Sequence, residues 1–194
     1  MLRNNSVLIV DDQINAIFDS SSSNVTIPTG TEVVDVAGKI ISPGFVDTHR
    51  HGWQTAFKTI ASNTSLSEYF ARYGEFASQD LFTADDIYWG QLAGHLENLN
   101  AGVTSILDHA HGSWSDATAQ AGLNGSIDSG ARVFHAYTVH PLTNNYTIDD
   151  QLAKLKSIAQ EGLYKNTSVS LGLAYDFFCC ATPDEVNSVI AAAT

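Results

Sequence analysis

Two histidines separated by one residue, His49 and His51, are the residues whose types and spacing point most directly to chemistry. They end the segment SPGFVDTHRH, in which a Pro-Gly turn precedes a short apolar run. Because side chains alternate along a strand, both imidazoles would lie on one face of an extended segment. Imidazole binds zinc and similar ions, but a catalytic site needs further protein ligands and an open position for water. The pair alone therefore fits either part of a metal site or ordinary loop histidines.

Other candidate site residues stand at the ends of later apolar runs. His109 and His111 repeat the spacing of the first pair, which leaves three readings: a second metal ion, a substrate-orienting or ligand-supporting role for His109, and a structural histidine. His140 ends another run beside Pro141 and is a better candidate for the active-site side than His135, which lies within that run.

Three further polar residues have simpler interpretations. His95 has charged and polar neighbours in a helical pattern and is expected at the surface or in helix packing. Arg50 points away from the histidines on a strand and is expected in a structural ion pair. Asp47 precedes the pair and is assigned to the interior of the expected barrel.

The elements that must position these residues change in type after Pro43-Gly44. Before that turn, short apolar runs separated by turn residues predict a small sheet. After it, near-continuous apolar runs alternate with helical patterns, which indicates βα units and a parallel sheet with both faces covered. The predicted strands are residues 7–10, 14–18, 32–36 and 39–41, then 44–48, 103–108, 132–139 and 169–175.

Three threonines mark helix starts. Thr83 can cap a helix that closes at Gly102, with its apolar residues on one face. Thr147 precedes an amphipathic pattern that ends at Gly162, and Thr182 precedes a proline and two carboxylates. The face expected to be apolar in the first helix consists of Ile87, Leu92, Leu96 and Leu99.

The fold expected from this order is α/β. Residues 1–42 form part of a small N-terminal β-domain, and residues 43–194 form about four βα units of a TIM-like (β/α)8 barrel. Because such barrels usually have about 250 residues, the pattern predicts a chain cut in the middle of the fold.

The composition argues against some kinds of binding partner. The 194 residues carry a net charge of -12 and no basic cluster, which argues against nucleic acid. No apolar run is long enough to span a membrane, and the N-terminal run is too short for a signal peptide. A cytoplasmic protein of this class is expected.

The run GKIISPGFVDTHRHGWQ resembles the first barrel strand of the amidohydrolase superfamily. The later segments LENLNAGVTSILDHAH and ARVFHAYTVHP are similar to its aminohydrolase and chlorohydrolase branch, which contains cytosine, guanine and triazine deaminases. The resemblance covers nearly the whole chain and corresponds to the N-terminal half of such an enzyme.

The resemblance implies that His49 and His51 are ligands of one divalent metal ion, zinc in the first place and iron as the alternative. It also implies that the other ligands come from later strands: histidines of the fifth and sixth, and an aspartate of the eighth that handles protons. Trp53 and Gln54 would line the substrate pocket, together with His109 and His140. For the first two, the competing interpretation is that Trp53 packs the barrel mouth and Gln54 caps the next helical segment.

The function that the resemblance implies is hydrolysis of a non-peptide carbon-nitrogen bond by metal-activated water. The partner would be a small-molecule substrate, a nitrogen heterocycle that is deaminated or dechlorinated, and a homo-oligomer is compatible with the pattern. No catalytic residue is assigned within these residues, so the chain by itself is expected to be inactive. The alternative is a non-catalytic remnant, or a half-barrel that requires self-association or a partner chain.

Overall fold

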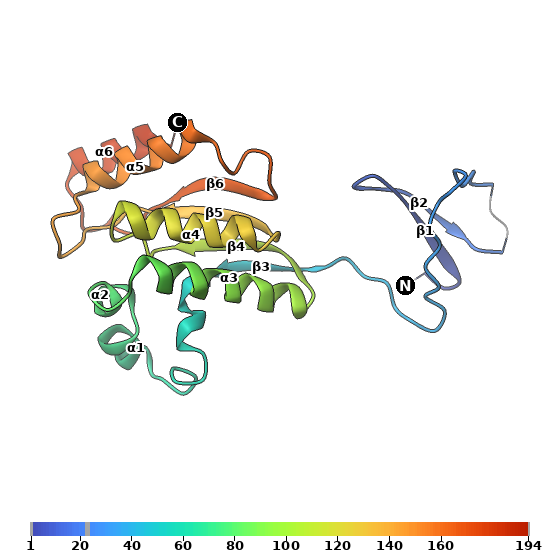
Figure 1. Ribbon diagram of the computed structural model, residues 1–194, viewed down its shortest axis with the longest axis horizontal. Coiled ribbons are helices and arrows are strands. Elements are labelled where there is room, and N and C mark those ends of the chain that lie inside the picture. The colour runs from blue at the N-terminus through green and yellow to red at the C-terminus, as the bar shows by residue number, and fades with distance from the viewer. Residues whose placement is uncertain (1, 22–23, 194) are drawn as a thin grey trace. The chain divides into compact units, whose positions relative to one another are not determined.

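The computed structural model describes residues 2–21 and 24–193 and divides into two compact units, Met1–Ser42 and Pro43–Thr194 (Figure 1). The first unit contains an antiparallel pair of strands, β1 (Asn5–Val10) and β2 (Gln13–Asp19). Asp11 between them has a positive φ of 54°, a conformation that aspartate tolerates in tight hairpin turns. The two strands predicted at residues 7–10 and 14–18 are confirmed.

The strands predicted at residues 32–36 and 39–41 are wrong, because the structure has no strand in either segment. The apolar side chains on which the prediction depended, such as Val33 and Ile40, are largely exposed. A β-branched residue favours a strand through packing and pairing with neighbours, and here it has neither.

The second unit is built on a parallel sheet in which strand order follows chain order, β3-β4-β5-β6. Seven helical segments connect or follow these strands (Figure 1). The four predicted strands and the α/β fold class are confirmed. The strands are β3 (Phe45–Arg50), β4 (Val103–Ala110), β5 (Arg132–Thr138) and β6 (Val169–Ala174); the helices are η1 (Gly52–Phe57), α1 (Leu66–Arg72), α2 (Glu75–Ser78), α3 (Ala84–Asn100), α4 (Asp116–Asp128), α5 (Ile148–Glu161) and α6 (Pro183–Ala192).

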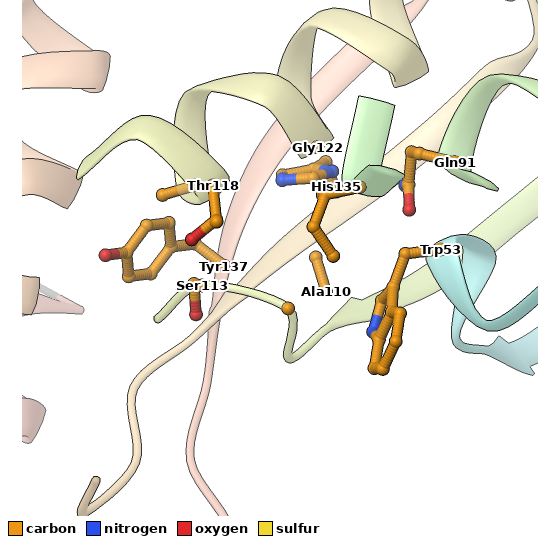
Figure 2. Close-up of a pocket in the computed structure, with 11 residues that line it drawn as sticks. Trp53, Gln91, Ala110, Ser113, Thr118, Gly122, His135 and Tyr137 are labelled. Atoms are coloured by element: carbon orange, nitrogen blue, oxygen red, sulfur yellow. The ribbon is translucent and has the colours of Figure 1, made fainter. Parts of the chain in front are cut away.

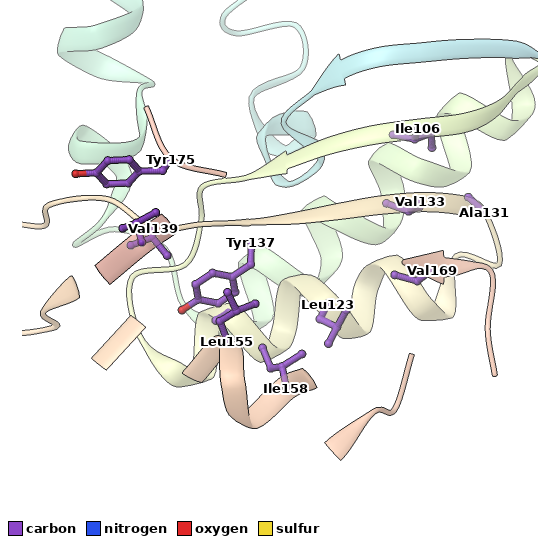
Figure 3. Packing of buried hydrophobic residues seen from close by; sticks show 12 residues of the cluster. Ile106, Leu123, Ala131, Val133, Tyr137, Val139, Leu155, Ile158, Val169 and Tyr175 are labelled. Atoms are coloured by element: carbon purple, nitrogen blue, oxygen red, sulfur yellow. The ribbon is translucent and has the colours of Figure 1, made fainter. Parts of the chain in front are cut away.

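The main hydrophobic core lies between one face of this sheet and helices α4, α5 and α6 (Figure 3). Ile106, Val133 and Val169 contribute from three neighbouring strands, and Leu123 and Ile158 contribute from the helices. Such burial of aliphatic side chains supplies most of the stabilisation of a domain.

The other face of the sheet is open in this structure. Leu107 of β4 and Phe134 of β5 alternate with the core residues and are 42% and 50% exposed. A barrel strand buries both faces, so these two side chains correspond to positions that a closed barrel would cover.

Helix α3 differs from the prediction in which face it buries. Of the residues predicted on its apolar face, Ile87 is buried and Leu92 is half-buried, but Leu96 and Leu99 are 47% and 37% exposed, so the prediction is wrong for the C-terminal half of the helix. After Ile87, the buried face carries small and polar residues: Gly90, Gln91, Gly94, His95 and Asn98. This face contacts the backbone of η1 and a polar network on the sheet, which is why leucine does not occupy it.

Helix α4 is not predicted by the apolar pattern, because its buried residues are mostly small. Small residues allow close approach: a Cβ on Gly125 would lie 2.8 Å from the carbonyl oxygen of Tyr88 in α3. Close packing of two helices leaves little of the wide apolar face from which amphipathic helices are recognised.

The predicted helix starts at Thr83, Thr147 and Thr182 are confirmed as N-caps. Thr147 and Asp150 form a reciprocal capping box at α5, and Gly162 closes that helix with a φ of 65°. We expect Thr147→Ala to lower the free energy of unfolding by about 0.5–2 kcal/mol, measured by urea denaturation. Ser157→Ala, at a half-buried position of the same helix that bonds Glu161 rather than the helix end, is the control and should change it by less than about 0.5 kcal/mol. An equal effect of both would contradict the capping role.

Candidate active site

His49 and His51 lie together where β3 ends and η1 begins. Their Nε2 atoms are 3.3 Å apart, and their rings meet edge to face. A hydrogen bond at this distance requires one ring to donate and the other to accept. The two side chains therefore converge on one point, as their spacing predicts.

The hydrogen bond on the other side of the His51 ring fixes its tautomer. His51 Nδ1 lies 2.9 Å from the carbonyl oxygen of His109, which can only accept, so Nδ1 carries the proton. Burial lowers the pKa of His51 and outweighs the opposing effect of this hydrogen bond, which keeps the ring neutral near pH 7. The Nε2 lone pair is therefore free to accept a hydrogen bond or bind a metal ion.

His109 and His111, at the end of β4, complete a cluster of four imidazoles, in which the His111 ring centre lies 4.0 Å from that of His51. The His109 ring centre lies 5.4 Å from that of His49 and 5.2 Å from that of His51. The Nε2 atom of His109 lies 3.0 Å from a carboxylate oxygen of Asp176, which comes just after β6. Burial lowers the pKa of His109, and the Asp176 charge opposes that effect. Sequence reasoning missed Asp176, although its position at a strand end was a usable signal.

Trp53 lies behind the cluster and is 1% exposed. Its indole N–H donates to His111 Nδ1 at 3.0 Å, and its ring packs edge to face against Phe82 and Trp114. Burial lowers the pKa of His111 well below its usual value. This geometry favours the packing interpretation of Trp53, and its contact with a substrate stays a prediction.

Gln54 links η1 to helix α1. Its Nε2 donates to the hydroxyl of Tyr69 and to the carbonyl oxygen of Tyr73, each at 3.0 Å. These bonds hold the loop after the histidine pair against the α1 segment. A direct contact of Gln54 with substrate stays a prediction.

His140 follows β5 and is completely buried. Its Nδ1 is 3.5 Å from Glu75 of α2, whose other oxygen lies 3.6 Å from His111, and neither ring nitrogen of His140 has a hydrogen-bond partner within the described part of the chain. The ring of Phe76, also from α2, lies 6.0 Å from that of His140. A substrate contact of His140 stays a prediction, and Glu75 is a neighbour that sequence reasoning missed.

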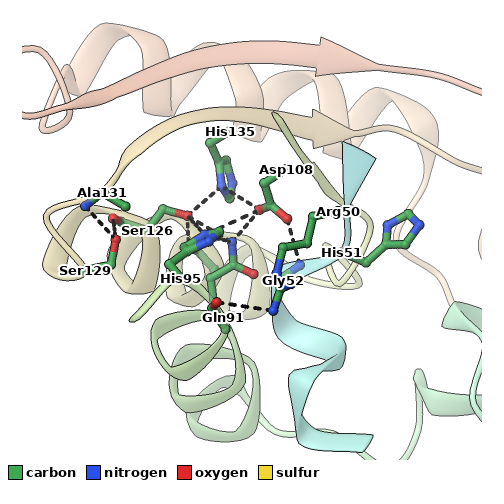
Figure 4. Close-up of polar contacts among 12 residues, drawn as sticks. Arg50, His51, Gly52, Gln91, His95, Asp108, Ser126, Ser129, Ala131 and His135 are labelled. Atoms are coloured by element: carbon green, nitrogen blue, oxygen red, sulfur yellow. Dashed lines mark hydrogen bonds and ion pairs between the residues drawn. The ribbon is translucent and has the colours of Figure 1, made fainter. Parts of the chain in front are cut away.

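A buried polar network lies on the helix side of β4 and β5 (Figure 4). It centres on the carboxylate of Asp108, which has no exposed surface and is approached by Gln91, His95 and His135. His95, expected at the surface or in helix packing, is fully buried in this network, and burial lowers its pKa to about 4. The surface interpretation of His95 is therefore wrong, and its role in helix packing is confirmed, because its Nε2 lies 3.2 Å from Ser126 of α4.

Arg50 and Asp47 lie on the α3 side of β3. Arg50 donates to the carbonyl oxygen of Gly94 at 3.2 Å and lies 4.0 Å from Asp47, which accepts a hydrogen bond from Asn98. Arg50 thus has a structural ion pair, as predicted. Asp47 contacts a helix and not the barrel interior, so the earlier interpretation of Asp47 is wrong.

The cavity in Figure 2 does not contain the histidine cluster. It has a volume of about 10 Å³, room for about one water molecule, and lies between the sheet and helices α3 and α4. Trp53, His135 and Tyr137 contribute to its wall. This space is too small for a nucleobase, so it is not the substrate pocket of such a compound.

Two features are absent from residues 2–21 and 24–193. No group of three or more His, Cys, Asp or Glu side chains is arranged to hold a metal ion there. None of the helices in these ranges has the length and apolar character needed to cross a membrane.

Comparison with known proteins identifies the class of protein. Residues 40–176 match the model of the amidohydrolase family. The chain belongs to this family, and the resemblance seen in its motifs is confirmed.

Two relatives are deaminases of adenosine-like compounds. The chain is 32% identical over 133 residues to a 5'-deoxyadenosine deaminase of Methanosarcina acetivorans, an alignment that covers 66% of this chain and 29% of that protein. It is 38% identical over 77 residues to a 5-methylthioadenosine/S-adenosylhomocysteine deaminase of Desulforudis audaxviator, covering 40% of this chain and 18% of the relative. The chain thus matches less than a third of the length of these curated relatives.

Solved structures support the fold. A guanine deaminase of C. acetobutylicum with bound guanine superimposes with a TM-score of 0.72 and 18% identity, over 95% of this chain and 44% of that chain. An adenosine deaminase of Xanthomonas campestris with bound zinc gives a TM-score of 0.53 and 18% identity, over 69% and 29% of the two chains. The four βα units therefore match part of an amidohydrolase barrel.

Proposed function

We propose that these residues belong to a metal-dependent deaminase of a purine nucleoside or related nitrogen heterocycle. The observation that carries the proposal is the convergence of His49 and His51 Nε2 at 3.3 Å, with the proton of His51 held on Nδ1. Two nitrogens bound tetrahedrally to one zinc ion at about 2.0–2.1 Å would lie about 3.3–3.4 Å apart. The pair fits such an ion once His49 carries its proton on Nδ1.

Bound there, a divalent ion such as zinc or iron would supply a nucleophilic water at neutral pH. The chain's own residues would orient the ligands and the substrate. The His109 carbonyl holds the His51 ring, an arrangement that usually sets the orientation of metal-binding histidines. His109 itself, steadied by Asp176, can offer its ring to a heterocycle beside the pair.

Two imidazoles fill only part of a tetrahedral site, and a third ligand has to come from further strands of a complete barrel. We therefore expect the 194 residues by themselves to have no turnover. The similarity to adenosine-type deaminases favours a purine nucleoside over the triazine and cytosine rings that the family resemblance also allows. A soluble small molecule of this kind is consistent with a cytoplasmic enzyme.

The test uses the protein expressed from its complete coding sequence, with the 194-residue chain as control. Each is incubated with adenosine, 5'-deoxyadenosine, 5-methylthioadenosine and guanine, and ammonia release is measured before and after removal of metal by a chelator. We expect release from at least one adenosine-type substrate, lost with the metal and restored by zinc. Release that persists without metal would exclude the metal mechanism.

The second candidate function is a half-barrel that associates with itself or a partner. The open apolar face that contains Leu107 and Phe134 favours it. Absence of ammonia release from every substrate in both proteins would leave this candidate in place of the enzyme.

A further inference from the structure

The peptide that follows His51 is held from the helix side of the sheet. The Gly52 N–H donates to Oδ1 of Asp108 at 2.8 Å (Figure 4). The two residues are 56 positions apart in the sequence and belong to neighbouring elements, η1 and β4. This bond fixes the point at which the chain leaves β3 and turns into η1, directly beside the histidine pair.

The carboxylate of Asp108 is itself held in one orientation. Its second oxygen accepts a hydrogen bond from Gln91 of α3 and lies 3.5 Å from His135 Nδ1 of β5. Ser126 of α4 bonds the same two partners, at 2.9 Å from Gln91 and 3.1 Å from His135. Side chains from two helices and the next strand thus keep Oδ1 directed at Gly52.

Helix α3 also restrains this turn directly, through its backbone. A Cβ on Gly94 would lie 2.6 Å from the carbonyl oxygen of Gly52, so the two backbones are in direct contact. Arg50 donates to the carbonyl oxygen of Gly94 and to Thr55, and so bridges β3, η1 and α3. The segment from Arg50 to Thr55 is fixed at several points: the His51 ring bonds the His109 carbonyl, and the peptide that follows His51 bonds Asp108.

Burying a carboxylate is a costly way to satisfy one N–H group. A backbone carbonyl or a serine could accept the same bond without the desolvation of a charge, and buried charges are weak evidence for stability. Buried charged groups are better explained where they hold a neighbouring group in one orientation, as the outer-shell partners of metal ligands do. A full set of donors around Asp108 agrees with such a role.

We propose that Asp108 is a positioning residue, which through the Gly52 peptide sets the orientation of His51 toward His49. The part of this inference that concerns metal binding rests on the proposed function. It adds to that function a residue on the far side of the sheet that touches neither metal nor substrate.

The test compares Asp108→Ala and Asp108→Asn in the full-length protein with Ile158→Ala, a core substitution in α5 remote from the turn. Each is studied at a temperature at which circular dichroism shows it folded. The first readout is hydrogen exchange of the backbone amides of residues 49–57. The second is Co²⁺ affinity and the visible absorption spectrum of bound Co²⁺, which reports coordination geometry.

We expect Asp108→Ala to accelerate exchange in residues 49–57, weaken Co²⁺ binding about 10-fold to 100-fold and alter the spectrum. Asp108→Asn keeps an oxygen that can accept the Gly52 N–H, so it should accelerate exchange less and weaken Co²⁺ binding less than Asp108→Ala. It serves as the test variant if the alanine variant does not fold. Ile158→Ala should retain the wild-type exchange in this segment, affinity and spectrum.

The inference is overturned if both Asp108 variants exchange at the wild-type rate in residues 49–57, or if Ile158→Ala produces the same changes. A wild-type protein that binds no Co²⁺, or a His51→Ala variant that binds it as tightly as wild type, would refute the proposed metal function instead. In that event, the exchange of the Gly52 segment alone decides whether Asp108 holds the turn.

Discussion

Replacement of His49 or His51 by alanine is expected to remove metal-dependent turnover from the full-length protein. Their Nε2 atoms converge at 3.3 Å, so either substitution removes one of the two proposed ligands. We expect kcat/KM to fall by more than about 100-fold, which is the upper end of the effect of losing an outer-shell partner. The metal content, measured by elemental analysis after dialysis, should fall in parallel.

Lys58→Ala is the matched control for these two variants. Lys58 lies seven residues after His51, is exposed and pairs only with Glu97 at the surface, so its loss should leave activity and metal content unchanged. Full activity of both histidine variants, with wild-type metal content, would refute the ligand assignment. Loss of activity with retained metal would assign the pair to substrate binding.

A methyl group added at Gly90 is the second change for which we expect a large effect. Gly90 lies on the buried face of α3, and a Cβ there would overlap the carbonyl group of Trp53 in η1. In an exposed helix interior, alanine is favoured over glycine by about 1 kcal/mol. Here the clash is with backbone, which cannot rotate away, and we expect Gly90→Ala to destabilise the fold by about 1–3 kcal/mol in urea denaturation.

Gly122→Ala in α4 is the control that separates the effect of a steric clash from that of the higher helix propensity of alanine. Gly122 is also buried within a helix, but the nearest atom to an added Cβ is 3.6 Å away, which is ordinary contact. This variant should be neutral or more stable by up to about 1 kcal/mol. If Gly90→Ala stabilises the protein as much as Gly122→Ala, the close contact between α3 and η1 does not exist in solution.

The sequence predicted the elements whose signals are local. The parallel strands were marked by continuous apolar runs, and helices α3, α5 and α6 by threonine caps followed by carboxylates. The convergence of His49 and His51 also followed from a local rule, the alternation of side chains along a strand.

The parts that could not be predicted depend on contacts between distant segments. His95 has the sequence neighbours of a surface residue, and only the approach of Asp108 from β4 gives it a buried polar environment. Val33 and Ile40 have high strand propensity, yet a strand also requires a neighbour to pair with, and the sequence does not reveal its absence. Asp176 carries no spacing pattern, and its one sequence signal was its place directly after the strand predicted at residues 169–175.

The sequential strand order of the second unit bears on how the chain folds while it is being synthesised. Each strand pairs with the one made before it, so βα units can join the sheet one after another as they leave the ribosome. On the sheet of these four strands, Leu107 and Phe134 are 42% and 50% exposed and present apolar surface on the chain as it is made. A chaperone that binds apolar side chains would therefore find both of them accessible on this sheet.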